Sequence, residues 1–302
     1  MRFSLSLPRP TDDAGAEAID DAIEIAAHAE HLGLHAVSAS DHPFPAVAPG
    51  EAGHQAFDPF VLLATVGAAT SHIHLHFSLI VSPYRNPFLT ARSLATLDLA
   101  TRGRVIAGMG AGYLAAEFRA LGASLEGRAA RVADDIEAMT TAWLGEPVHA
   151  KGDGWEAVGN SMLPRPASRP RPAIWRGGNA LAAIDHAVRA CDGWTPFEVN
   201  AVGSRLTASK ELSLETLPAR MALLGETIER HGRTEPLDVC YVRTSRRWLA
   251  EDATIFDDLS QLAELGVTWL EFTVPGSEPL EVADHLERFT ALAGEAGVLD
   301  PR

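Results

Sequence analysis

Residues 103–113 read GRVIAGMGAGY, a short apolar run that ends in three alternating glycines, Gly108, Gly110 and Gly112. Such a run is typical of a strand buried on both faces, and glycines at its end are typical of a turn into a helix. A dinucleotide-binding fingerprint would need a further glycine at position 113, where Tyr113 stands, so that motif is excluded. The glycines either form a tight turn or remove side chains where a flat ring approaches the backbone.

The same unit recurs on both sides of this stretch. Short apolar runs alternate with longer amphipathic ones, which is the pattern of βα units around a parallel sheet. We expect strands at residues 3–7, 36–40, 73–81, 104–108, 173–176, 193–195, 237–242 and 268–274. We expect helices at residues 16–32, 59–70, 87–99, 114–121, 128–144, 180–190, 217–231, 253–265 and 279–293. Asp58 and Asn86 each precede a proline and are expected to cap a helix. Eight such strands favour a closed (β/α)8 TIM barrel, with an open doubly wound sheet as the alternative.

The length suits one domain over residues 1–302, because a barrel of this kind needs roughly 250 residues. Residues 146–172 are rich in Gly and Pro and predict an insertion before the fifth strand, with a short hairpin as its content. Residues 200–215 predict a long polar loop. It is either a ligand-binding loop at the barrel mouth or a disordered surface loop.

The formal net charge is −15, which argues against nucleic acid or a membrane surface as a partner, since both attract clustered Lys and Arg. No apolar run approaches the roughly 18 residues of a membrane span. The acidic residues after Pro10 end the N-terminal segment before a signal peptide could form. Cys191 and Cys240 are too few for a disulfide framework. We therefore expect a cytoplasmic protein.

Arg176-Gly177-Gly178-Asn179 follows a predicted strand and opens a predicted helix. Glycines there leave backbone N–H groups to face an anion, and the helix N-terminus adds about half a positive charge. Asn179 is expected either to cap the helix or to donate to a phosphate, while Arg176 either adds charge or points outward. A plain left-handed turn is the alternative.

Asp41 and His42 end the second predicted strand, where a barrel enzyme places catalytic side chains. His42 could exchange a proton near neutral pH, and Asp41 could fix its tautomer. A purely structural histidine is the alternative.

His74 and His76 share one face of the third predicted strand and resemble the His-x-His metal pair of barrel amidohydrolases. They lie at the start of that strand, away from the usual active-site face. The later histidines His186, His231 and His285 fall in helices, and no acidic residue ends the eighth strand. We expect no metal site, and a metal hydrolase remains as an alternative.

Taken in order, these motifs resemble the luciferase-like monooxygenase superfamily, in particular its branch that uses coenzyme F420. The resemblance runs along nearly the whole chain. It is carried by residues 79–87, 94–98 and 103–113, then by Glu117-Phe118, Leu121-Gly122, Arg128, Arg131, Trp143, Pro170, Pro172, and residues 177–179 and 192–194.

The resemblance implies a bulge at the end of the third strand, where a non-prolyl cis peptide at Ser78-Leu79 backs the deazaflavin ring. It places His42 near the reactive ring, residues after the fourth strand beside the cofactor, and the paired glycines on its phosphate. The candidate set is therefore catalytic His42 with cofactor-binding Asp41, His42, Ser78, Leu79, Val81, Gly110, Gly112, Tyr113, Arg176, Gly177, Gly178 and Asn179.

The implied activity is hydride transfer between F420 and a small organic substrate. An FMN-dependent monooxygenase and a non-catalytic flavin-binding protein are the alternatives, and members are commonly homodimers. Two departures weaken the link to the sugar-phosphate dehydrogenases of this branch. Ala46, with Phe44 nearby, stands where they have an aromatic residue, and Tyr113 replaces an acidic one. The loops at 43–55 and 200–215 have no readable pattern, so the substrate is not predicted.

Overall fold

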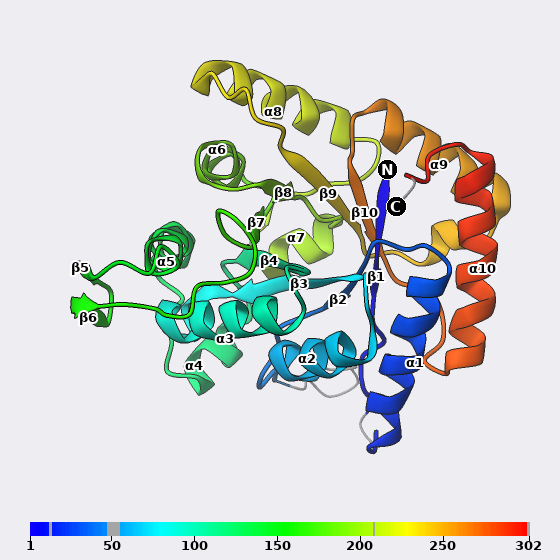
Figure 1. Cartoon of the computed structure of the whole chain (residues 1–302). Helices are drawn as coiled ribbons and strands as arrows, with labels where there is room; N and C mark the ends of the chain where they lie inside the picture. The colour runs from blue at the N-terminus through cyan, green and yellow to red at the C-terminus, as the bar shows by residue number, and fades with distance from the viewer. Residues whose placement is uncertain (12–13, 47–54, 208, 301–302) are drawn as a thin grey trace.

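The computed structural model describes residues 1–11, 14–46, 55–207 and 209–300, and its strands close into a barrel of eight parallel strands (Figure 1). Around the barrel they follow the order β1-β10-β9-β8-β7-β4-β3-β2, which confirms the predicted (β/α)8 fold and rules out the open sheet. The barrel strands are β1 (Arg2–Ser6), β2 (Ala36–Ala39), β3 (His74–Val81), β4 (Val105–Gly110), β7 (Ala173–Gly177), β8 (Gly193–Thr195), β9 (Asp238–Arg243) and β10 (Trp269–Phe272).

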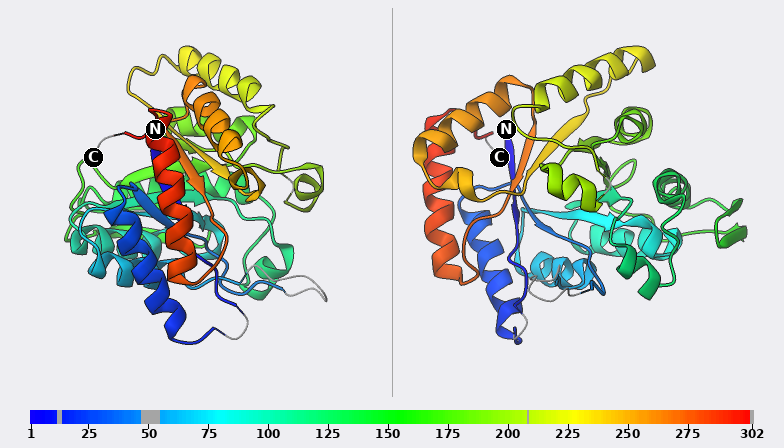
Figure 2. Two further views of the ribbon diagram at one scale, coloured as in Figure 1. Left: turned by 90° about the vertical axis from the view of Figure 1, so that its right-hand side faces the viewer. Right: turned by 180° about the vertical axis from the view of Figure 1, so that it is seen from behind.

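Helices form the outer layer around these strands. They are α1 (Glu17–His31), α2 (Pro59–Ala69), α3 (Pro87–Ala100), α4 (Ala115–Ala120), α5 (Arg128–Ala142), α6 (Leu181–Ala190), α7 (Ala201–Thr207), α8 (Leu217–His231), α9 (Asp252–Glu264) and α10 (Pro279–Glu295), with 3-10 helices η1 (Ser82–Tyr84) and η2 (Arg247–Leu249). The first and last helices, α1 and α10, lie side by side over the junction of β1 with β10 (Figure 2). In the described part of the chain, no helix is both long enough and apolar enough to cross a membrane.

The barrel interior is packed with side chains. Strands β2, β4 and β10 are buried along their whole length, because one face fills the barrel and the other lies under the helices. The rings of Trp175 and Trp269 lie 5.1 Å apart inside the barrel. They pack with Ala36, Ile106 and Cys240. Because this layer is filled, a ligand site has to lie at the rim.

Two helix starts follow directly from their sequence. The Asp58 side chain accepts from the backbone N–H groups of Phe60 and Val61 at 2.9 and 3.0 Å, and Asn86 accepts from Phe88 at 2.9 Å. Both residues are the N-caps of α2 and α3, so both predicted caps are confirmed.

Residues 146–172 leave the barrel before β7. They contain β5 (Val148–Gly152) and β6 (Trp155–Asn160), which form a two-stranded antiparallel sheet that stands apart from the barrel (Figure 1). Trp155 anchors this hairpin to α3, since its ring centroid lies 4.8 Å from that of Phe88.

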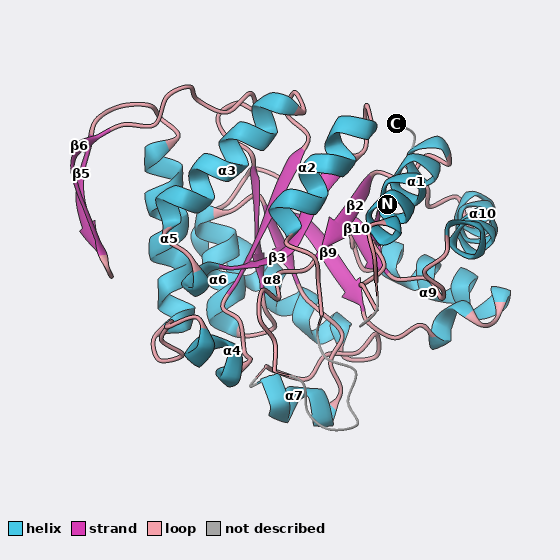
Figure 3. Ribbon diagram, turned by 90° about the horizontal axis from the view of Figure 1, so that it is seen from below, coloured by secondary structure: helices cyan, strands magenta, loops and turns pink. Residues whose placement is uncertain are grey.

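The prediction that residues 200–215 form only a long polar loop is wrong, because α7 lies within them. Asn200 Oδ1 accepts from the Gly203 N–H at 2.9 Å, as a helix cap does. Val199 and Leu212 exchange backbone hydrogen bonds of 2.8 and 3.0 Å, and Leu212 is buried. The polar composition of the segment concealed this helix. In Figure 3, α4 and α7 lie at the end of the barrel toward which the strands point.

Candidate functional site

The predicted bulge lies at the C-terminal rim of the barrel. The pairing of β3 with β4 shifts register between Phe77 and Ile80, and the Ser78–Leu79 peptide is cis. A Cβ placed on Gly177 would lie 1.9 Å from Leu79 Cδ1, so β7 ends directly beside the bulge. The structure therefore brings Ser78, Leu79 and Gly177 together at one rim.

The glycines at this rim make room for the Leu79 side chain. Cβ atoms on Gly108 and Gly110 would lie 2.6 and 3.0 Å from Leu79 methyl carbons, and the one on Gly108 only 2.2 Å from the Phe77 carbonyl oxygen. The Leu79 side chain thus occupies the space that side chains at Gly108 and Gly110 would fill. A ring bound at this rim would contact Leu79 rather than the backbone of these glycines. This observation favours the packing of Leu79 over an open backbone as the reason for these glycines.

Gly112 is required for a second reason. Its φ is +70°, and a Cβ there would lie 2.5 Å from Val81 Cγ1 and 2.9 Å from the Phe118 ring. Val81 is buried and its N–H donates to Asp41 Oδ2 at 3.0 Å. Gly112 and Val81 therefore pack the turn after β4 against the end of β3.

The Asp41 side chain binds the end of β3 and does not bind its sequence neighbour, His42. This buried carboxylate accepts from both terminal nitrogens of Arg85, with Nη2 at 3.0 Å from Oδ1, in addition to the Val81 N–H. The idea that Asp41 fixes the tautomer of His42 is therefore wrong. A bidentate arginine partner has taken both carboxylate oxygens.

The partner of His42 is Glu117, which the motif analysis missed. Glu117 is fully buried on α4, and its Oε2 lies 3.2 Å from His42 Nδ1. The same carboxylate accepts from the Tyr84 hydroxyl at 2.9 Å and from the Phe44 N–H at 3.0 Å. Burial raises the pKa of Glu117, but these hydrogen bonds outweigh it and hold the pKa below its usual value.

A charged Glu117 can orient the His42 ring. The side chain of His42 is 10% exposed, so it lies at the edge of the rim rather than in the core. The ring of Tyr113 packs edge-on against it at 6.0 Å between centroids. Asp41, His42 and Tyr113 thus belong to one cluster around Glu117 and Arg85.

The turn after β7 is more fully hydrogen bonded than its sequence predicts. The sequence predicts that the Gly178 amide binds a phosphate. Its N–H instead donates to the Thr195 carbonyl at 3.1 Å, so this amide is not available to a phosphate. Its φ of +127° requires glycine. The buried Asn179 amide nitrogen donates to the carbonyls of Phe197 and Lys210 at 2.8 and 2.9 Å, and its Oδ1 accepts from the Phe197 N–H at 3.0 Å. Asn179 therefore joins three stretches of backbone and does not cap the helix.

Helix α6 begins after Ala180, which provides no side-chain cap. In the described residues, no acceptor pairs with the backbone N–H groups of Leu181 and Ala182. Arg176 is buried and donates to the carbonyls of Gly177 and Met109, and burial lowers its pKa to about 10. The anion-attracting groups here are thus the first amides of α6.

The two histidines of β3 do not converge on one point. His74 Nδ1 lies 3.3 Å from the Arg104 carbonyl, whereas His76 Nδ1 lies 3.2 Å from Ser4 Oγ inside the barrel. Burial lowers the pKa of both, that of His76 to about 3, so His76 is neutral at pH 7. An acidic residue does lie nearby, namely Glu271. It was overlooked because it is within β10 rather than at its end.

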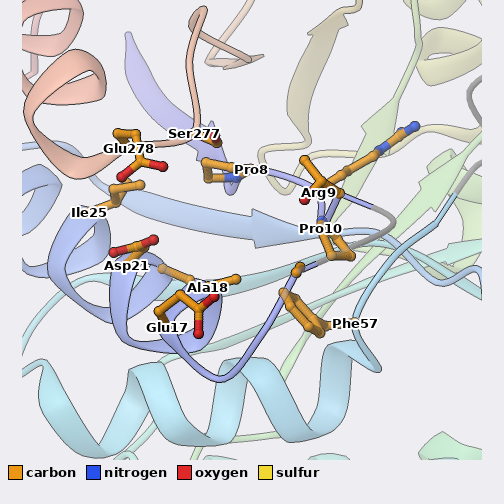
Figure 4. A pocket seen from close by; sticks show the side chains of 13 residues that line it. Pro8, Arg9, Pro10, Glu17, Ala18, Asp21, Ile25, Phe57, Ser277 and Glu278 are labelled. Atoms are coloured by element: carbon orange, nitrogen blue, oxygen red, sulfur yellow. The ribbon is translucent and has the colours of Figure 1, made fainter.

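A cavity of about 190 Å³ opens beside the ends of β1 and β10 (Figure 4). The carboxylates of Glu17, Asp21 and Glu278 face it, while Arg9 extends away from it. Phe57, which lies just before α2, forms part of its wall. The cavity belongs to the same end of the barrel as His42. Residues 47–54 of the predicted 43–55 loop lie outside the described residues.

Comparisons with known proteins agree with this architecture. A family model described as luciferase-like monooxygenase matches residues 1–209. The chain is 30% identical over 273 residues to the F420-dependent glucose-6-phosphate dehydrogenase of Amycolatopsis mediterranei, which covers 88% of this chain and 77% of that protein. It is 27% identical over 182 residues to the oxygenase component of the flavin-dependent trigonelline monooxygenase of Acinetobacter baylyi, covering 58% and 48% of the two chains. The solved structure of an F420-dependent secondary alcohol dehydrogenase with an F420–acetone adduct matches with a TM-score of 0.78 at 16% identity over 99% of both chains, which shows a shared fold.

Proposed function

The chain belongs to the luciferase-like monooxygenase family, and on that premise we propose that it is an oxidoreductase that uses coenzyme F420 for hydride transfer with a small organic substrate. The observation that carries this proposal is the meeting of the Ser78–Leu79 bulge, the His42–Glu117 pair and the start of α6 at one rim. F420 is favoured over FMN because the similarity to the F420-dependent relative extends over more of the chain.

The residues present at the rim fit such a cofactor. Leu79 offers a half-buried apolar surface, against which a flat ring can lie. The N–H groups of Leu181 and Ala182 suit a phosphate, because they combine two donors with the positive end of the α6 dipole. When bound, the deazaflavin supplies the hydride chemistry.

The chain itself supplies orientation and a proton site. Glu117 holds His42 Nδ1 at 3.2 Å, and we assign proton exchange with the substrate to the His42 imidazole. The glucose 6-phosphate of the relative is not carried over, since Ala46 and Tyr113 depart from the pattern that the resemblance implies for the sugar-phosphate dehydrogenases of this branch.

The direct test is titration of the purified protein with F420 and with FMN, each oxidised and reduced, followed by fluorescence. We expect F420 to bind at least tenfold more tightly than FMN. Tighter binding of FMN would transfer the proposal to a flavin-dependent monooxygenase, and binding of neither would refute it. His42→Ala should retain cofactor binding and lose turnover. Unchanged turnover would remove the assigned role of His42.

A single proline substitution tests whether the first backbone N–H groups of α6 bind the cofactor phosphate. Leu181 is the first residue of α6, where proline is tolerated, and Ala180 has φ −80° and ψ 150°, which suits a following proline. Leu181→Pro removes one N–H donor and should weaken F420 binding about tenfold, the value of one charge-assisted hydrogen bond. Leu181→Ala retains the donor and is the matched control, expected to bind within threefold of the parent.

A further inference from the structure

A buried polar cluster lies inside the barrel directly below the bulge, and the proposed reaction does not use it. Its centre is Glu271 of β10, which is 4% exposed. One carboxylate oxygen accepts from Ser38 Oγ at 2.8 Å and the other from Ser78 Oγ at 2.6 Å. Glu271 therefore connects β10 to β2 and to the first residue of the bulge on β3.

The other groups that face Glu271 come from three directions. His76 Nδ1 of β3 lies 3.6 Å from Glu271 Oε2, and it also contacts Ser4 of β1. The Cys240 thiol of β9 is buried beside the carboxylate, and burial raises its pKa well above the usual value. The charge of Arg9, on the segment after β1, acts on Glu271 from the mouth.

A metal ion does not suit this cluster. The ligand atoms of His76, Cys240 and Glu271 lie within 4.8 Å of one another, but burial keeps the Cys240 thiol protonated, whereas zinc binds a thiolate. Both oxygens of Glu271 already accept from serine hydroxyls. The cluster is therefore better explained by hydrogen bonding within the protein.

We propose that Glu271 is a positioning residue that holds the Ser78–Leu79 bulge from inside the barrel, a role that bears on catalysis only if the proposed function is correct. Ser78 is tied to Glu271 through its hydroxyl, and the next side chain, Leu79, fills the space left by Gly110 and Gly177. Moving Ser78 therefore moves the apolar surface offered to the ring. Buried hydroxyls that lose their acceptor carry a desolvation cost, so the native position depends on the carboxylate.

The proton state of Glu271 should be visible at the bulge. Burial raises the pKa of Glu271 to about 7, while the hydrogen bonds from Ser78 and Ser38 act in the opposite direction. An ionised carboxylate accepts stronger hydrogen bonds than a neutral one. The bulge should consequently be held more firmly above pH 7 than below it.

The test compares Glu271→Gln and Ser78→Ala with the parent protein, and uses Ser4→Ala as the control. Ser4 lies in the same buried layer and contacts His76, but its hydroxyl is not bonded to the bulge. The first measurement is the hydrogen-exchange protection of amides 79–82 in the cofactor-free protein between pH 6 and 8. The second is the Kd for F420 and for FMN.

We expect protection of these amides to rise with pH in the parent and to be flat in Glu271→Gln, with at least tenfold lower protection above pH 7. The same variant should bind the cofactor at least tenfold more weakly, and Ser4→Ala should change both by less than threefold. If Glu271→Gln does not fold, Ser78→Ala carries the same comparison. Parent-like protection in the variants overturns the inference. A parent that binds neither cofactor refutes the proposed function, while the exchange data still decide the role of Glu271.

Discussion

The most discriminating perturbation is a single methyl group added at Gly177. A Cβ there would lie 1.9 Å from Leu79 Cδ1 and 3.1 Å from Leu79 Cγ, so the leucine side chain has to move. The φ angle of Gly177 is not in the left-handed region, and alanine can adopt this backbone. The cost of Gly177→Ala is therefore overpacking against one side chain, which is about 1–3 kcal/mol.

Leu79→Ala should remove that cost. In this background the added methyl group meets an empty space, and Gly177→Ala becomes neutral or stabilises by about 0.4–1 kcal/mol through the unfolded state. A double-mutant cycle, measured by urea unfolding, should thus give a coupling energy of about 1–4 kcal/mol. Gly108→Ala is the control, because its Cβ would also lie 2.2 Å from the Phe77 carbonyl oxygen, which Leu79→Ala does not relieve.

Equal costs of Gly177→Ala with and without Leu79 would refute the argument that the rim glycines accommodate this side chain. F420 titration of the same variants separates the two explanations of the glycines. If a ring contacted the glycine backbone directly, Gly177→Ala would weaken binding in both backgrounds. If Leu79 lies between them, binding should recover in the double variant relative to Gly177→Ala.

Three further outcomes follow from the buried hydrogen bonds. Glu117→Leu removes a fully buried carboxylate and leaves its three part-buried partners without it, so it should lower the free energy of unfolding by about 3 kcal/mol. Glu117→Gln should cost less than half of that, and equal costs in urea unfolding would contradict this. The pKa of Glu271 is about 7 in the folded protein and 4.5 ordinarily, so the parent should lose about 3 kcal/mol of stability as the pH rises from 4.5 through 7. Glu271→Gln should lack this loss, and parallel stability–pH curves for the two proteins would count against the assignment. Asn179→Ala removes three hydrogen bonds and should lower the free energy of unfolding by about 2–4 kcal/mol, measured by urea unfolding. Asn160 is exposed, and Asn160→Ala should lower it by less than about 0.5 kcal/mol. A similar loss for both variants would show that the hydrogen bonds of Asn179 contribute little.

The barrel could be predicted from sequence because its signals are local. An apolar run such as residues 105–107 identifies a strand, and Asp58 and Asn86 identify helix starts, since each acts on backbone only a few residues away. The site depended on longer contacts. Glu117 lies 75 residues from His42, and nothing near either residue indicates that they pair.

The remaining errors have the same origin. Asp41 is adjacent to His42 in sequence, yet the geometry of Arg85 draws its carboxylate elsewhere. The glycine run could not indicate by itself that Leu79 fills the space beside it, because Leu79 belongs to a different strand. Glu271 lies inside a strand, where an acidic residue is uncommon. Its serine partners lie on β2 and β3, so no residue near it in the sequence indicates its role.

Asn179 has a consequence for how this scaffold can diversify. The Asn179 side-chain amide forms hydrogen bonds with the backbone at Phe197 and at Lys210. The chain is therefore bound to the start of α6 at both of these points. The length and sequence of the chain between these two points can change while Asn179 and its hydrogen bonds are kept. Changes in the length or sequence of this stretch are therefore separable from changes in the barrel that supports it.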